Sequence, residues 1–89
     1  MIDPRHTVSI EYCVPCGYRE RALGLAGEVL EAWAPVLVEV VLKTGSKGCF
    51  EVLLDGEQVF SKAELGRFPE PGEVGRSLEP RLGPPVAGK

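Results

Sequence analysis

Cysteine, positive charge and long apolar runs are all scarce in this chain of 89 residues. Three cysteines, an odd number, are too few for the disulfide framework of a small secreted protein. Ten Lys and Arg against thirteen Asp and Glu give a net charge of -3, which argues against a nucleic-acid-binding surface. No apolar run approaches the roughly 18 residues of a membrane-spanning helix. Residues 1–6 lack the basic-then-apolar pattern of a signal peptide, so we expect a cytoplasmic protein that binds neither nucleic acid nor membranes.

Thermolabile side chains are scarce as well. The chain has no Asn and a single Gln, Gln58, but eight Pro. Depletion of such residues, together with proline-rich connections, is typical of proteins from thermophiles. A GC-rich genome would also favour Ala, Gly, Arg and Pro, yet the combination predicts a thermophilic source.

The length and composition fit one small globular domain. Hydrophobic residues make up 44% of the chain and charged residues 26%, which is the balance of a folded domain rather than a disordered one. We expect a flexible N-terminus at residues 1–6, a single domain at 7–82 and a flexible tail at 83–89.

Hydrophobic periodicity divides the domain into six elements. These are a strand at 7–12, a helix at 17–33, strands at 36–42, 50–54 and 58–62, and a short helix at 73–82. The apolar face expected for the first helix consists of Ala22, Leu23, Ala26, Leu30 and Trp33.

The second strand and the turn after the third strand carry the clearest signals. The run at 36–42 is almost continuously apolar and β-branched, which predicts a strand covered on both faces. Asp55-Gly56 is a strong signal for a two-residue hairpin between the third and fourth strands.

The order of elements, β-α-β-β-β-α, restricts the topology. The first β-α-β unit should be a right-handed parallel crossover, and the next two strands an antiparallel hairpin. The sequence therefore predicts an α/β protein with a four-stranded mixed sheet and two helices, which is the minimal thioredoxin-like fold.

The residues with most obvious chemistry are Cys13-Val14-Pro15-Cys16, at the junction of the first strand and first helix. A helix N-terminus favours a thiolate, and Pro15 suits a first helical turn. A second thiol one turn away can attack a mixed disulfide formed at the first. We expect a redox-active dithiol in which Cys13 is the more exposed nucleophile and Cys16 is turned into the helix.

Two other functions are compatible with the same residues. Cys13, Cys16, Cys49 and His6 are the ligand types of a structural zinc site, although His6 lies in the expected frayed N-terminus and Pro15 restricts the loop. The domain could instead be a non-enzymatic binding adaptor that uses the loop as a recognition surface. We favour the redox centre, and expect neither a metal nor a cofactor.

Several residues are candidate neighbours of the site. Tyr12 and Tyr18 flank the cysteines and either shield a disulfide or simply pack. Arg19 either raises the positive potential beside a thiolate or is a solvated charge. Cys49 begins the third strand, so it should lie near the pair, either as a third redox position or as a small buried hydrophobe. Trp33 is expected in the core.

Five stretches of the chain resemble those of a known family in the same order. They are Ile10–Ala22, Gly48–Val52, Asp55-Gly56, Val59–Lys62 and Gly66–Glu70. With them the chain resembles the selenoprotein W-like group, also called the Rdx or SelT/SelW/SelH family. The resemblance implies a thioredoxin-like fold and a thiol–disulfide role with glutathione or protein thiols as partners.

The chain departs from its apparent relatives in two places. Selenium-containing members carry selenocysteine at the position of Cys16, which implies that they attack from the second position. Thioredoxins place a cis-proline before the third strand, where this chain has Gly48-Cys49. This difference puts proline-dependent docking of substrates in doubt.

Overall fold

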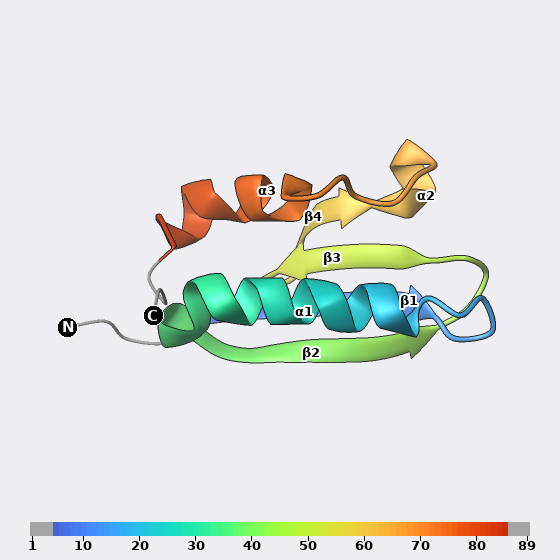
Figure 1. Ribbon diagram of the computed structural model, residues 1–89, viewed down its shortest axis with the longest axis horizontal. Helices are drawn as coiled ribbons and strands as arrows, with labels where there is room; N and C mark the ends of the chain where they lie inside the picture. The colour runs from blue at the N-terminus through green and yellow to red at the C-terminus, as the bar shows by residue number, and fades with distance from the viewer. Residues whose placement is uncertain (1–4, 86–89) are drawn as a thin grey trace.

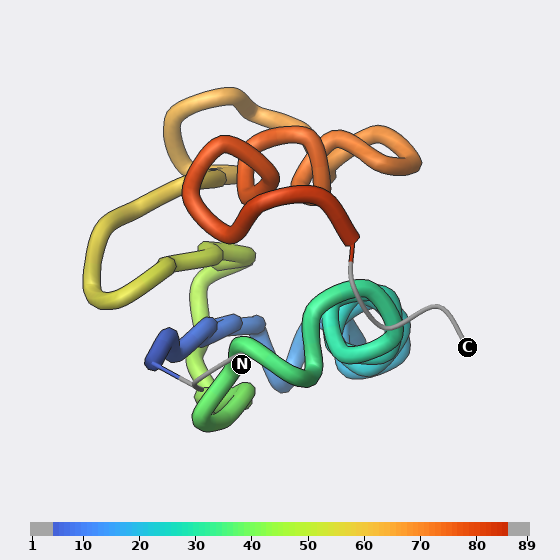
Figure 2. Tube along the Cα trace, turned by 90° about the vertical axis from the view of Figure 1, so that its left-hand side faces the viewer, coloured from blue at the N-terminus to red at the C-terminus, as the bar shows by residue number. Residues whose placement is uncertain are grey.

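The protein is a mixed sheet with its two longer helices on one side (Figures 1 and 2). The computed structural model describes residues 5–85. Its elements are β1 (His6–Cys13), α1 (Arg19–Trp33), a 3₁₀ turn (Ala34–Val36), β2 (Leu37–Gly45), β3 (Phe50–Leu54), β4 (Glu57–Ser61), α2 (Lys62–Leu65) and α3 (Glu73–Leu82). The predicted α/β fold and strand order are confirmed, with α2 as an additional helix.

The sheet has the strand order β2-β1-β3-β4. β1 pairs with β2 in parallel and with β3 in an antiparallel direction, and β3 and β4 form an antiparallel hairpin. Asp55 and Gly56 at the hairpin tip both have positive φ, 53° and 83°, as a type I′ turn requires. The Asp55 carboxylate also accepts a hydrogen bond from the Thr7 amide at 2.9 Å, which ties the hairpin to β1.

β2 is an edge strand, and the prediction that both its faces are covered is wrong. Leu37 is its one buried residue, whereas Val38 and Leu42 are exposed. β1 is its sole neighbour in the sheet, and α1 and α3 lie on the same side of the strands (Figure 2). A four-stranded sheet with one helical layer cannot cover an edge strand from both sides, however apolar its sequence.

The core lies between the sheet and the two longer helices. The buried residues of α1 are Ala22, Leu25, Ala26, Val29 and Trp33. The predicted Leu23 and Leu30 are instead exposed. α1 is apolar on two adjacent stripes, so the periodicity of the sequence alone did not determine which stripe the sheet and α3 would cover.

The C-terminal half of the chain closes the open side of α1. α3 packs against α1 and β4, burying Val74, Leu78 and Leu82. The buried Trp33 donates from Nε1 to the carbonyl of Gly83 at 2.8 Å, which fixes the end of α3 to the end of α1. Trp33 is therefore a core residue, as predicted.

The start of the domain differs by one residue from the prediction. His6 begins β1 rather than ending a loose segment, and its Nδ1 lies 2.7 Å from Asp55 Oδ2. The predicted flexible ends, 1–6 and 83–89, lie outside the described residues at 1–4 and 86–89. Within the described part, the amides of Arg5 and Gly83 donate to the carbonyls of Val36 and Glu79 at 3.1 and 2.8 Å. Between residues 5 and 85, no helix combines the length and apolar character that crossing a membrane requires.

Candidate functional site

A disulfide connects Cys13, the last residue of β1, to Cys16 in the turn that follows. Their Cα atoms are 5.3 Å apart, within the usual range for a disulfide. The turn is held by backbone hydrogen bonds from Val14 to the carbonyl of Gly45 at 3.0 Å and from Tyr18 to the carbonyl of Cys13 at 3.3 Å. These contacts fix both cysteines at the end of the sheet where β1 and β2 finish.

The two cysteines differ sharply in exposure, in the opposite sense to the prediction. Cys13 is 0% exposed, whereas Cys16 is exposed. The prediction turned Cys16 into a helix that begins at residue 17, but α1 begins only at Arg19. Cys13 is therefore covered as part of the sheet, and Cys16 projects in a turn that precedes the helix. Cys16 is therefore the more exposed residue of the pair.

Cys49 lies beside Cys13, as predicted from the order of the strands. The Cys13 amide donates to the Cys49 carbonyl at 2.9 Å, which extends the β1–β3 ladder by one residue. A Cβ atom built on Gly45 would lie 2.7 Å from the Cys49 Sγ. Because β1 runs between β2 and β3, the Cys49 side chain reaches across the end of β1 toward Gly45.

The thiol of Cys49 is held in its protonated form. Burial raises its pKa first, and the carboxylates of Glu11 and Glu51 raise it further because they repel a thiolate. Glu11 approaches from the same side as the thiol, since its Oε2 lies 2.8 Å from the Cβ position of Gly45. Near neutral pH this third cysteine is a poor nucleophile.

An aromatic cluster supports the turn from the other side. The ring of Tyr18 meets Phe68 edge-on, with 4.7 Å between centroids, and Phe68 meets Phe50 in the same way at 5.5 Å. The guanidinium of Arg21 lies over the Phe68 ring, 3.8 Å from its centroid. Sequence reasoning missed Phe68, although its loop was among the stretches that carried the family resemblance.

A shallow depression of about 290 Å³ adjoins the disulfide turn. It is lined by Tyr12, Val14, Gly17, Arg19, Glu20 and Thr44. Arg19 is highly exposed, and its guanidinium lies 3.7 Å from the Glu20 carboxylate. Tyr12 is buried and packs in the core rather than shielding the disulfide. The surface next to Cys16 is therefore open and carries one exposed cation.

The geometry gives no support to the zinc alternative. His6 and Cys13 are the first and last residues of β1, so they lie at opposite ends of an eight-residue strand. Nδ1 of His6 is occupied by its contact with Asp55. Among residues 5–85, no cluster of three or more His, Cys, Asp or Glu side chains is arranged to hold a metal ion.

The fold and the site together define a thioredoxin-like domain with a CxxC disulfide where its first strand meets its first helix. The chain belongs to the Rdx family, whose model matches residues 7–79.

Two mammalian relatives share much of this sequence. Migration and invasion enhancer 1 of Bos taurus is 42% identical over 69 residues, covering 75% of this chain and 58% of the relative. The same protein of Mus musculus is 40% identical over 62 residues, covering 70% of this chain and 52% of the relative. The chain thus spans less than two thirds of the length of either relative.

Two bacterial crystal structures share the fold over nearly their whole length. A selenoprotein W-related protein from Vibrio cholerae superposes with a TM-score of 0.83 at 24% identity, covering 88% of this chain and 98% of that one. A protein from Bordetella parapertussis gives a TM-score of 0.82 at 28% identity, covering 86% and 98%.

Proposed function

We propose that this protein exchanges thiols and disulfides with partner molecules through Cys13 and Cys16. The observation that carries the proposal is the asymmetry of the pair: Cys16 is exposed in a turn and its disulfide partner Cys13 is buried at the end of β1. That arrangement separates an attacking from a resolving position. It also agrees with the selenocysteine that selenium-containing relatives carry at the position of Cys16.

The exchange balances without a cofactor. In the reduced protein, the Cys16 thiolate attacks one sulfur of a partner disulfide, forming a mixed disulfide and releasing the first partner thiolate, which takes up a proton. Cys13, after losing its proton, then attacks the Cys16 sulfur and releases the second partner thiol. Two electrons pass to the partner, and the protein is left with the Cys13–Cys16 disulfide. Two thiols such as glutathione reverse the process.

Protein thiols or glutathione are the proposed partners. The depression beside the turn leaves room for a peptide segment of a partner near Cys16, and Arg19 offers an exposed cation for a carboxylate of that partner. Gly48 and Cys49 occupy the position before β3 where thioredoxins have a cis-proline. Partners would therefore dock without a contact to that proline.

Turnover tests the proposal directly. The protein, supplied with glutathione or dithiothreitol, should reduce a small model disulfide such as hydroxyethyl disulfide. The Cys13→Ser/Cys16→Ser double variant should fall to the background rate, while Cys49→Ala should retain activity. Equal, near-background rates for the native protein and the double variant would contradict a redox role and favour the binding adaptor.

The cellular setting also belongs to the proposal. A reversible dithiol and an odd number of cysteines fit the reducing cytoplasm. The depletion of Asn and Gln supports a thermophilic source. A melting temperature below about 65 °C, within the range of mesophilic domains, would contradict the thermophilic origin.

A further inference from the structure

A second hollow lies on the α1 side of the molecule, separate from the depression beside the disulfide turn. It is a groove of about 320 Å³ between the first half of α1 and the loop of residues 66–72. We call it the α1–loop groove. Its apolar lining consists of Leu25, Phe50, Phe68, Pro69, Pro71 and Val74. The volume is at the lower end of the range for binding pockets, so it suits one or two apolar side chains.

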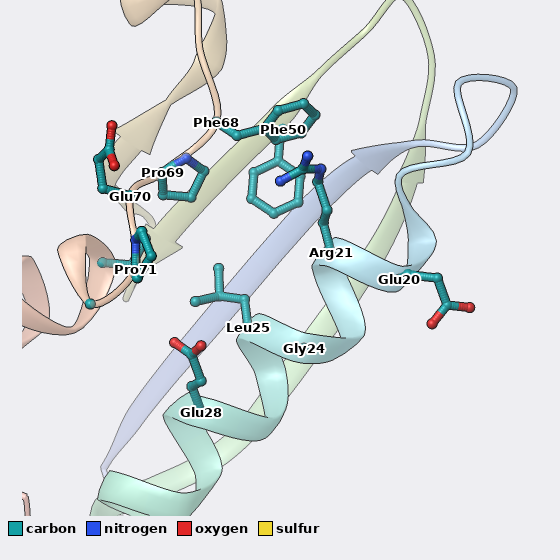
Figure 3. Close-up of a pocket in the computed structure, with 12 residues that line it drawn as sticks. Glu20, Arg21, Gly24, Leu25, Glu28, Phe50, Phe68, Pro69, Glu70 and Pro71 are labelled. Atoms are coloured by element: carbon teal, nitrogen blue, oxygen red, sulfur yellow. The ribbon is translucent and has the colours of Figure 1, made fainter.

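The lining is an apolar surface with acidic groups around it. In Figure 3 the carboxylate of Glu28 and the side chain of Leu25 point into the space between α1 and the loop. Glu20 and Glu70 also belong to the lining, at its edges. Among the described residues, neither Glu28 nor Glu70 has an ion-pairing partner for its carboxylate.

The charge of the groove is uneven from end to end. Its one cation, Arg21, is stacked on Phe68 at the end nearest the disulfide turn. The other end holds Glu28 (Figure 3), and Arg76 lies outside the lining, with a guanidinium nitrogen 3.1 Å from the Cβ position of Gly72. An occupant that complements this surface carries an apolar side chain for the floor and a Lys or Arg for Glu28.

The groove is also within reach of the reactive sulfur. Phe68, part of its lining, packs on Tyr18, two residues beyond Cys16. Glu28, the residue that a basic side chain would meet, lies nine residues beyond Arg19 on α1, so its Cα is at most about 24 Å from that of Cys16. About seven extended residues of a bound peptide span that distance.

We propose that the α1–loop groove docks the protein partners of the dithiol, by binding a segment with an apolar residue next to a basic one, about seven residues from the partner cysteine. This inference rests on the proposed thiol–disulfide function and names its substrate class: protein disulfides in a basic, apolar context, in preference to glutathione disulfide.

Two exposed glycines of α1 provide a matched test. Gly24 lines the groove, whereas Gly27 does not, and a Cβ at either position would meet nothing within 4 Å. Both glycines lie within the helix, so a Met at either position favours α1. Gly24→Met therefore fills the groove without straining the fold, and Gly27→Met is its control. Glu28→Lys, with Glu31→Lys as control, reverses the charge alone.

The kinetic experiment uses two disulfide-containing peptides that differ only in a Leu-Lys or Leu-Glu pair seven residues from the cysteine. The reduced protein should react faster with the Leu-Lys peptide. Gly24→Met and Glu28→Lys should each lower that rate by about fivefold or more, while both controls keep it. All variants should reduce hydroxyethyl disulfide at the native rate. The proposal would be overturned if Gly24→Met reacted with the Leu-Lys peptide at the rate of the native protein. It would also be overturned if the native protein showed no preference between the two peptides.

Direct binding separates this proposal from the redox function. A Leu-Lys peptide with Ser in place of Cys cannot exchange, so its binding reports the groove alone. In NMR titrations it should shift the amide signals of Leu25, Glu28 and Val74 in the native protein and not in Gly24→Met. If the protein fails to reduce any disulfide but these shifts occur, the redox function fails and the groove stands. If the reverse holds, the groove fails and the redox function stands.

Discussion

Cys16 is exposed in a turn that is closed by backbone hydrogen bonds, and its disulfide partner Cys13 is a buried residue of the sheet. The difference arises because β1 continues to Cys13, whereas α1 begins only at Arg19. At this scale the structure reverses the exposure of the two cysteines that was predicted from the CxxC spacing. We expect solvent access, rather than the position of the helix N-terminus, to select the attacking sulfur.

We predict that Cys16 is alkylated first in the reduced protein. With limiting iodoacetamide at neutral pH, peptide mass spectrometry should find label on Cys16 well before Cys13, because a fully buried sulfur presents no surface to the reagent. Cys13→Ser should keep the fast phase of labelling and Cys16→Ser should lose it. Faster labelling of Cys13 would restore the order of attack predicted from the sequence.

Cys49 should respond to pH as a thiol with a raised pKa. In the Cys13→Ser/Cys16→Ser background, its alkylation rate should reach half its maximum above the pH at which an ordinary thiol does. Glu11→Gln removes one of the repelling charges, so it should lower the pKa and accelerate labelling near neutral pH. Glu31→Gln, on the exposed side of α1, serves as the control. If the Cys49 thiol titrated at or below the ordinary thiol pKa, burial and the neighbouring carboxylates would not be raising its pKa, which would contradict this description of its surroundings.

The sequence predicted which residues form the site but not how they are exposed. Cys13 and Cys16 follow from their local spacing in the sequence. The position of Cys49 near them follows from the predicted topology, which makes the third strand a neighbour of the first. The end of β1 is hydrogen-bonded to Gly45, the last residue of β2, and to Cys49, which precedes β3. Phe68 supports the turn across a gap of fifty residues from Tyr18. No local pattern reports such contacts.

At the scale of elements, the loop between α2 and α3 is held by one ion pair. Arg67 donates to both carboxylate oxygens of Glu73, at 2.7 and 3.0 Å, and the Glu70 amide donates to the same carboxylate at 2.8 Å. Glu73 is the first residue of α3, where a negative charge also complements the helix dipole. The pair therefore fixes the wall of the α1–loop groove that α1 does not provide.

The Glu73 carboxyl should titrate far below its ordinary range. The hydrogen bond from Arg67 lowers its pKa to about 2. Since the folded-state pKa is depressed, the stabilising effect is complete above the ordinary pKa near 4.5 and is lost as the pH falls through about 2. NMR detection of the side-chain carboxyl should show this, and Arg67→Ala should return the pKa toward its ordinary value. A native midpoint near 4.5 would exclude the ion pair in solution.

The contact between α1 and α3 depends on Trp33. Trp33→Phe keeps an aromatic ring in the core but removes the donor to the Gly83 carbonyl, so unfolding in urea should show a loss of about 1–2 kcal/mol. Leu30→Ala, on the exposed side of the same helix, should change stability by no more than about 0.5 kcal/mol. Circular dichroism measures both. Equal losses would contradict the assignment of the buried face.

The sequence determined the elements more reliably than their surroundings. The strands and both longer helices occur where periodicity and turn residues predicted them, and α3 spans residues 73–82 as expected. α2 was missed because four residues contain little periodic signal. It forms because Ser61 accepts from the Glu64 amide at 3.1 Å and Gly66 ends the helix at φ 73°. The prediction that both faces of β2 are covered was wrong because an apolar run does not show whether its strand is central or at the edge of the sheet.

At the scale of the whole molecule, the sheet order β2-β1-β3-β4 places β1 between two neighbours. The ends of β1 and β2 and the start of β3 therefore meet at one end of the sheet, which is where the disulfide turn lies. α1 and α3 lie on one side of the sheet (Figure 2), and the lining of the α1–loop groove includes Glu20, in the first turn of α1, close to the disulfide turn along the chain. The fold thus places the disulfide turn and one edge of the groove at the same end of α1.

The central claim, that Cys13 and Cys16 form one reversible dithiol–disulfide centre, is tested most directly by equilibration in glutathione buffers. The protein is equilibrated over a range of reduced-to-oxidised glutathione ratios, quenched with acid and alkylated, and each cysteine is counted by mass spectrometry. We expect Cys13 and Cys16 to become protected together in one two-electron transition, while Cys49 stays alkylated. If Cys13 and Cys16 remain alkylated at every ratio, or are oxidised independently of each other, the claim is wrong.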